Sequence, residues 1–255
     1  GVGGLTVVHE LMRQLPNEQI IYVGDTLRCP YGPRPPQEVR QFTREMVAFL
    51  LKQKIKMLVI ACNTATAFAL EMLRNELQIP VVGVIHPGAR AAIKVSQSNQ
   101  VGVIGTEGTI KSGAYETTLK RLKPNITVAS LACPNFVPLV EQGELEGNNA
   151  LALVRATLEP FITTHAMDTL VLGCTHYPLL RPLIQKVVGK DINIISSNEE
   201  VANEVSSVLS FLEQLAESPS PKAHAFYTTG DIELFHKVHQ RLFGDSVPKV
   251  KALTL

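Results

Sequence analysis

The chain has 255 residues, enough for one large domain or two small ones, and 45% hydrophobic with 18% charged residues is typical of a globular protein. Its 24 basic and 23 acidic side chains nearly cancel, and no run of Lys or Arg exceeds two, so we expect a small-molecule partner rather than nucleic acid or a membrane surface. No apolar stretch approaches the roughly 20 residues of a membrane helix, and the start lacks a signal-peptide pattern. We therefore expect a cytoplasmic protein.

The chain opens on the glycine-rich segment 1–4 without the strand that such a glycine turn normally follows, so we expect the first strand of the fold to be missing. Apolar residues at helical spacing follow over 5–15, and then 19–23 is typical of a strand that ends at Gly24 and Asp25. A Pro- and Gly-rich loop over 29–35 leads into a helix with Pro36 near its first turn.

The remaining chain alternates strands with helices. Helices are predicted most strongly over 64–77, 151–162, 179–188 and 201–215, and strands are predicted at 58–62, 81–85, 101–104, 127–131, 169–172, 192–195 and 223–227. Regular alternation of this kind predicts parallel sheets covered by helices. The Ser- and Pro-rich segment 217–222 is the one stretch with the composition of a linker.

Two strands end in the same way, with a cysteine. Residues 58–62 and 170–174 each carry an apolar run directly into Cys62 or Cys174, followed by polar side chains and then a helix. This repeat predicts an α/β protein of two similar flavodoxin-like domains with pseudo-two-fold symmetry and the active site in the cleft between them. The expected first domain comprises residues 1–86 and 196–255 and carries Cys62, while the second comprises 87–195 and carries Cys174.

The two strand-end cysteines are the main functional candidates. Open parallel sheets bind ligands at the carboxyl ends of their strands, and a helix N-terminus together with neighbouring hydroxyl and amide groups favours a thiolate. His176 stands two residues after Cys174 and could be its proton partner. Cys29 and Cys133 each precede proline and are interpreted as structural, and the four cysteines lack the spacing of a disulfide framework or a zinc cluster. From spacing alone, Glu141 is best interpreted as part of a solvated helix face.

At these residues the chain closely resembles the glutamate racemases of the cofactor-independent aspartate/glutamate racemase superfamily. The resemblance rests on several motifs spread over nearly the whole chain: 1–6 (GVGGLT), 24–26 (GDT), 28–32 (RCPYG), 61–65 (ACNTA), 80–85 (PVVGVI), 102–106 (GVIGT) and 173–179 (GCTHYPL). It departs from the family in two places, because the Asp-Ser pair expected before Gly1 is absent and Ser196-Ser197 stands where the family usually has Asp-Ser.

The resemblance implies interconversion of L- and D-glutamate for peptidoglycan synthesis, without a cofactor or metal, by a protein that is commonly a homodimer. It implies that Cys62 and Cys174 transfer protons on the two faces of the α-carbon, assisted by His176 and Glu141. It also implies that the substrate is bound by Tyr31, Gly32, Asn63, Thr64, Thr175 and His176.

Two other hypotheses remain open at the level of the residues. A cysteine hydrolase or acyl transferase would use Cys174 with His176 and would need only one of the two sulfurs. A glutamate-binding or regulatory protein on the same scaffold would bind the amino acid without turnover.

Overall fold

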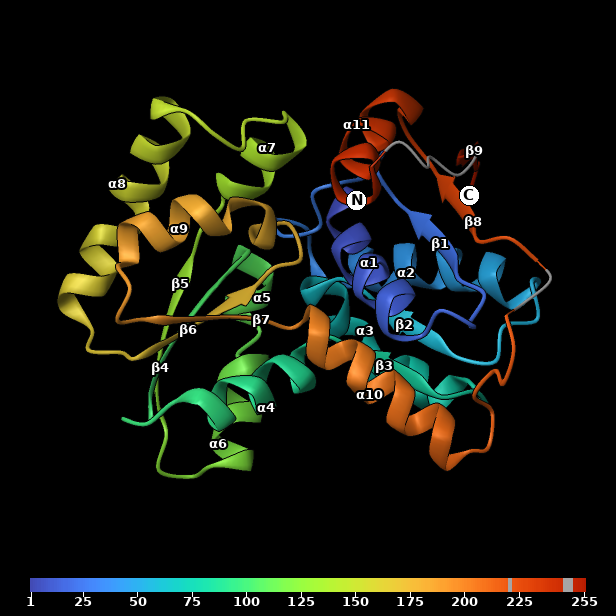
Figure 1. Cartoon of the computed structure of the whole chain (residues 1–255), viewed down its shortest axis with the longest axis horizontal. Coiled ribbons are helices and arrows are strands. Elements are labelled where there is room, and N and C mark those ends of the chain that lie inside the picture. The colour runs from blue at the N-terminus through green and yellow to red at the C-terminus, as the bar shows by residue number, and fades with distance from the viewer. Residues whose placement is uncertain (220–221, 245–249) are drawn as a thin grey trace.

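The computed structural model describes residues 1–219, 222–244 and 250–255 as an α/β fold with parallel sheets (Figure 1). The predicted linker 217–222 lies partly outside the described residues. Among the helices of the described part of the chain, none combines the length and apolar character needed to cross a bilayer.

The best-formed sheet has four parallel strands in the order β5-β4-β6-β7. These strands are β4 (Gln100–Gly105), β5 (Thr127–Ala132), β6 (Thr169–Gly173) and β7 (Asn193–Ser196). In the register, Ile104 of the central strand β4 stands between Leu131 of β5 and Leu172 of β6. Both central strands are buried on their two faces, which explains why they are continuous apolar runs in the sequence.

Helices cover both faces of this sheet (Figure 1). Ile104, Leu170 and Leu172 point to one core, which they share with α7 (Phe136–Glu141), α8 (Asn148–Thr164) and α9 (Arg181–Val188), the last preceded by the 3-10 turn η2 (Tyr177–Leu180). Val103 and Val171 point to the opposite core, with α4 (Ile85–Val95), α5 (Glu107–Lys111) and α6 (Ala114–Leu122). Alternate residues of one strand thus serve two separate cores.

The other strands form a three-stranded sheet, β1-β8-β9, and a two-stranded sheet, β2-β3, again with parallel pairing. They are β1 (Ile21–Gly24), β2 (Leu58–Ile60), β3 (Val81–Gly83), β8 (Ala225–Thr228) and β9 (Val250–Ala252). β8 pairs with β1, so the last part of the chain returns to the first part. We propose the division into 1–86 plus 196–255 and 87–195 on the basis of this sheet membership.

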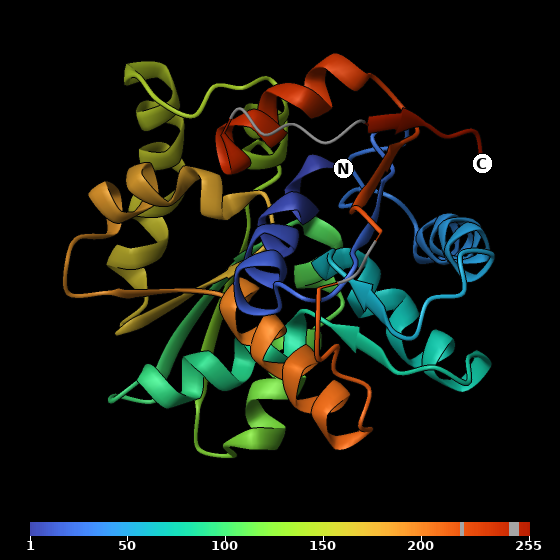
Figure 2. The same cartoon turned by 45° about the vertical axis from the view of Figure 1, so that its right-hand side comes forward.

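Helices also pack on both sides of β2 and β3. One side carries α2 (Pro36–Leu51) and α3 (Asn63–Glu76), and the other carries α1 (Leu5–Gln14) and α10 (Asn198–Phe211). Figure 2 shows α1 and α10 side by side. The turn η1 (Val2–Gly4) and α11 (Ile232–Phe243) complete a third apolar cluster around β1 and β8.

A cavity of about 520 Å³ lies between β1 and β2. Within the described residues, β1 pairs only with β8 and β2 only with β3, so the facing edges of β1 and β2 bound this cavity. Helix residues such as Val8 of α1 and Val47 of α2 close its two sides. The cavity runs along the full length of both strands to their carboxyl ends.

Several element boundaries differ from the prediction. The helix predicted over 201–215 already ends at Phe211, because Glu213 adopts a left-handed conformation and Gln214 N–H donates back to Leu209 O. The strand predicted over 81–85 ends at Gly83, and the chain enters α4 at Ile85. Pro87 lies in the first turn of this helix, where a backbone N–H would have no partner within the helix. Strand β9 was not predicted.

Candidate active site

The cavity ends at the carboxyl ends of β2 and β6 and brings both strand-end cysteines to one place. Cys62 and Cys174 line it together with the other residues that the sequence singled out for substrate binding: Tyr31, Gly32, Asn63, Thr64, Thr175 and His176. One cysteine follows a strand of the two-stranded sheet and the other follows a strand of the four-stranded sheet. The two thiols therefore reach a shared space from separate sheets.

Cys62 occupies the N-cap position of α3. Its backbone is extended, and its Sγ accepts a hydrogen bond from Ala65 N–H at 3.5 Å. A sulfur in this position replaces the usual capping oxygen and faces the positive end of the helix dipole.

Cys174 is more deeply buried, with 6% of its surface exposed. Burial raises the pKa of its thiol above the usual value, and the charge of Cys62 acts in the same direction, whereas the backbone N–H groups of His176 and Tyr177 lower it. The Nδ1 atom of His176 lies 3.6 Å from Cys174 Sγ. The imidazole is thus placed to exchange a proton with this sulfur.

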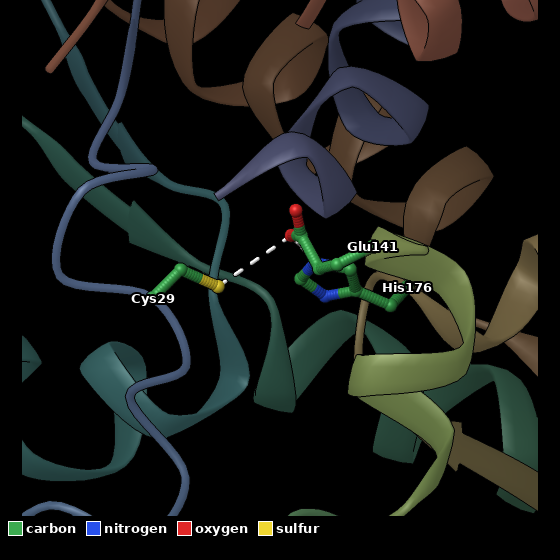
Figure 3. A group of neighbouring side chains, drawn as sticks. All are labelled: Cys29, Glu141 and His176. Atoms are coloured by element: carbon green, nitrogen blue, oxygen red, sulfur yellow. Dashed lines mark hydrogen bonds and ion pairs between the residues drawn. The ribbon is translucent and has the colours of Figure 1, made fainter. Parts of the chain in front are cut away.

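His176 is held on its other side by Glu141, the last residue of α7 (Figure 3). Its Nε2 lies 2.7 Å from Glu141 Oε1, and the two side chains are 10% and 19% exposed. Burial by itself would raise the pKa of Glu141, but the hydrogen bond and the charge of His176 outweigh it, so the pKa lies below its usual value. Glu141 is therefore a partly buried carboxylate that orients the imidazole, rather than part of a solvated helix face.

Cys29 also lies in this cavity, although its place before a proline favoured a purely structural interpretation. Its Sγ is 3.5 Å from Glu141 Oε1, and burial raises the pKa of its thiol to about 12. Cys133, by contrast, is buried in the core of the four-stranded sheet, with its Sγ 3.9 Å from Leu131 O.

A set of polar side chains stands beside Cys62. Asn63 is buried, and its Oδ1 accepts a hydrogen bond from Tyr115 OH at 2.7 Å, while its Nδ2 has no partner among the described residues. The hydroxyls of Thr64, Thr106 and Thr109 form a buried cluster with separations of 2.8–3.1 Å. An unpaired buried N–H is costly, so the Asn63 amide is a donor prepared for a bound acceptor.

The two sheets are joined at the site by hydrogen bonds that cross between them. Thr175 Oγ1 donates to Ala61 O at 3.2 Å, and Gly108 N–H donates to Gly32 O at 2.8 Å. Tyr31 OH donates to Asp25, a buried carboxylate that also accepts from Thr229 Oγ1 at 2.7 Å. These contacts fix Tyr31, Gly32 and Thr175 at the rim of the cavity.

The glycine turn at the start of the chain lies against the same residues. A Cβ atom placed on Gly3 would be 2.4 Å from His176 Nδ1, which is closer than any non-bonded contact allows. Thr6 Oγ1 donates to Gly3 O at 2.8 Å and to Thr175 O at 3.1 Å, which holds the turn against the strand end of Cys174. Because Gly3 has no side chain, the imidazole of His176 can lie directly against the turn.

Sequence reasoning missed four residues of this region: Cys29, Thr106, Thr109 and Tyr115. Thr106 directly follows β4, so the strand-end argument that selected both cysteines applies to it as well. Tyr115 and Thr109 lie on helices, and no local pattern connects them to the site.

An α/β fold with two thiols, a histidine and several hydrogen-bond donors around one cavity defines an enzyme site suited to proton transfer at carbon. Residues 4–205 match the Asp/Glu/hydantoin racemase family, and the chain belongs to this family. The family places it among the isomerases, and the resemblance noted in the sequence is confirmed.

The relatives are glutamate racemases. The chain is 60% identical over 246 residues to a glutamate racemase of Oceanobacillus iheyensis, with 96% of this chain and 90% of that protein covered, and 55% identical over 255 residues to one of Bacillus cereus, with 100% and 94% covered. Among solved structures, glutamate racemase isoform RacE1 of Bacillus anthracis matches with a TM-score of 0.95, 49% identity and coverage of 100% and 95%. Glutamate racemase of Francisella tularensis in complex with D-glutamate matches with a TM-score of 0.91, 33% identity and coverage of 100% and 94%.

Proposed function

We propose that the protein interconverts L- and D-glutamate, with Cys62 and Cys174 as the two proton-transfer residues. The observation that carries this proposal is that the two cysteines, which end strands of different sheets, line the same cavity. Racemisation removes a proton bound to carbon from one face of the α-carbon and delivers another to the opposite face. Two separate thiols can do so without either having to move around the substrate.

For each turnover, one sulfur is a thiolate and the other a thiol, and the roles exchange with the direction of the reaction. At a reference pKa near 8.5, forming a thiolate at pH 7 costs about 2 kcal/mol. Beside Cys62, the N-terminus of α3 and Ala65 N–H lie against the sulfur. For Cys174, the imidazole of His176 takes up the thiol proton, and Glu141 stabilises the resulting imidazolium.

The carbanion is the more demanding species, because its charge must be delocalised onto the α-carboxylate. We propose that the free amide N–H of Asn63 and the hydroxyls of Thr64 and Thr175 donate to that carboxylate, and that Tyr31 and Gly32 bind at the rim of the cavity. Preorganised donors of this kind in a site shielded from water contribute several kcal/mol. The unpaired Nδ2 of Asn63 supports this assignment.

The experiment that tests the proposal follows racemisation by circular dichroism and α-proton exchange by NMR in heavy water. With two separate bases, D-glutamate formed from L-glutamate carries deuterium from the first turnover, whereas the remaining L-glutamate stays protonated at early times. Cys62→Ser and Cys174→Ser each abolish racemisation, and Cys133→Ser, a matched buried cysteine outside the cavity, retains it. Full activity in either of the first two variants removes that sulfur from its role.

The same measurements decide against the two alternatives. A hydrolase or acyl transferase that uses Cys174 and His176 has no need of Cys62, so loss of activity in Cys62→Ser excludes it. A binding protein takes up glutamate without exchanging the α-proton. The finer parts of the proposal, namely supply of D-glutamate for peptidoglycan, a cytoplasmic location and a homodimer, rest on the family resemblance, and sedimentation in solution tests the dimer.

A further inference from the structure

Cys29, Glu141 and His176 come from three distant parts of the chain and turn one potential ligand atom each toward a common point (Figure 3). Glu141 Oε1 is 2.7 Å from His176 Nε2 and 3.5 Å from Cys29 Sγ, and all three ligand atoms lie within 4.8 Å of one another. His176 is buried and the other two are partly buried, so the group is not an exposed acidic cluster. The proposed proton transfer has no use for the Cys29 sulfur.

We propose that these three residues form a binding site for a thiophilic divalent cation such as Zn²⁺, and that the bound cation inhibits the racemase. The claim that the cation inhibits the racemase rests on the proposed function, whereas the claim that the cation binds does not.

The donor set fits this cation. Thiolate sulfur, imidazole nitrogen and carboxylate oxygen are the ligands that Zn²⁺ takes in proteins, and three protein ligands leave a fourth position open. A tetrahedral Zn²⁺ with bonds of about 2.0–2.3 Å keeps its ligand atoms roughly 3.3–3.7 Å apart. The distance of 3.5 Å between Cys29 Sγ and Glu141 Oε1 already lies in this range. The distance of 2.7 Å between Glu141 Oε1 and His176 Nε2 widens when the metal takes the place of the proton on Nε2.

Binding balances as a simple exchange of a proton for the metal. The S–H bond of Cys29 breaks, its proton goes to solvent, and the sulfur forms a bond to Zn²⁺. The proton on His176 Nε2 moves to Nδ1, which frees the Nε2 lone pair for the metal, and the Glu141 carboxylate donates another lone pair. The thiolate and the carboxylate together neutralise the charge of the cation.

Occupancy would interrupt the relay from Cys174. His176 reaches Cys174 Sγ through Nδ1 and Glu141 through Nε2. With Nε2 bound to the metal, the neutral imidazole carries its proton on Nδ1, so the atom that faces Cys174 has no lone pair left to take the thiol proton. The cation therefore acts as an inhibitor rather than a cofactor.

The binding test uses the full chain without glutamate. Isothermal titration with Zn²⁺ is expected to show one cation per chain, and Co²⁺ is expected to give the near-ultraviolet charge-transfer band of a thiolate ligand. In Cys29→Ala the affinity for the cation falls by more than about tenfold, and the charge-transfer band disappears. Losing a residue that only supports a metal ligand already costs about tenfold in affinity, and losing a ligand costs more. Cys133→Ala changes neither. Cys29→Ser, which preserves side-chain size, gives the same result as Cys29→Ala, and circular dichroism verifies that each variant is folded.

An equal affinity in Cys29→Ala and the native chain overturns the site, as does a charge-transfer band that disappears only in Cys62→Ala. The activity arm then adds Zn²⁺ to the racemase assay. Inhibition that a chelator reverses and that is lost in Cys29→Ala supports the claim that the bound cation is an inhibitor. Binding without inhibition overturns that claim. A metal-free chain that never racemises glutamate contradicts the proposed function but leaves the cation-binding result unaffected.

Discussion

The hydrogen bond between His176 and Glu141 allows a quantitative prediction. Glu141→Gln keeps the size of the side chain but removes the charge that stabilises the imidazolium. The contact is short, at 2.7 Å, and largely shielded from water. A hydrogen bond to a charged group contributes about 1.5–3 kcal/mol, which corresponds to about a 10- to 150-fold loss of rate at 1.36 kcal/mol per tenfold.

The assay is racemisation of each enantiomer followed by circular dichroism. The enantiomers of glutamate have equal free energy in water, so kcat/KM must fall by the same factor in both directions. Glu141→Asp, which keeps the charge, is expected to retain more activity than Glu141→Gln. Glu144→Gln, an exposed glutamate one turn away, serves as the control with unchanged kinetics. A loss below about threefold in Glu141→Gln, or an equal loss in the control, refutes the reasoning.

Three further predictions concern other parts of the molecule. Gly3→Ala would place a Cβ 2.4 Å from His176 Nδ1, so the imidazole moves and kcat falls about a hundredfold, while thermal unfolding changes little. Burial would raise the pKa of Asp168, but hydrogen bonds from Ser96, Ser98 and Thr169 hold it well below the usual value. This partly exposed carboxylate therefore contributes about 1–2 kcal/mol to stability above pH 4, and the contribution is lost as the pH falls below 4. The free energies of unfolding of Asp168→Asn and the native chain, measured in urea, should therefore converge in acid. Tyr177→Phe removes the hydrogen bond from Tyr177 OH to the buried carbonyl of Cys133 at 3.0 Å, while Phe136 N–H still donates to that carbonyl at 3.2 Å. The free energy of unfolding therefore falls by about 0.5–1.5 kcal/mol in urea titrations, and an unchanged midpoint would contradict this.

The strands and most helices could be predicted because their burial is visible in local periodicity. β6 is buried at every position and reads as an uninterrupted apolar run, and α2 begins at Pro36 as expected. β9 could not be predicted in this way, because it is three residues long and two of them are exposed. The end of α10 was also missed, since Leu212 and Leu215 continue an apolar pattern that the left-handed Glu213 interrupts.

The candidate site was predictable to the extent that it follows from strand ends. Parallel strands deliver the residues after them to the carboxyl edge of their sheet, and the repeated strand end predicted two similar domains facing one cleft, which is why Cys62 and Cys174 could be assigned to one site from the sequence. Glu141 and Cys29 follow no such rule. Glu141 reaches His176 from the end of a helix, and Cys29 reaches Glu141 from a loop 112 residues away in sequence, so only tertiary packing brings them into contact.

The structure also shows that the two halves of the site are chemically unequal, although their strand ends look alike in sequence. Cys62 has a helix N-terminus and a backbone N–H, both fixed dipoles whose effect does not depend on a further proton. Cys174 is buried in a setting that disfavours its thiolate, and it lies next to an imidazole that can take up a proton and that is itself held by a carboxylate. A difference of this kind is consistent with a substrate that is chiral at the reacting carbon, because each face presents a different arrangement of carboxylate, amine and side chain. Since the enantiomers are equal in free energy, the inequality cannot favour one product at equilibrium. In the proposed two-thiol mechanism, it can only determine which proton transfer limits the rate in each direction.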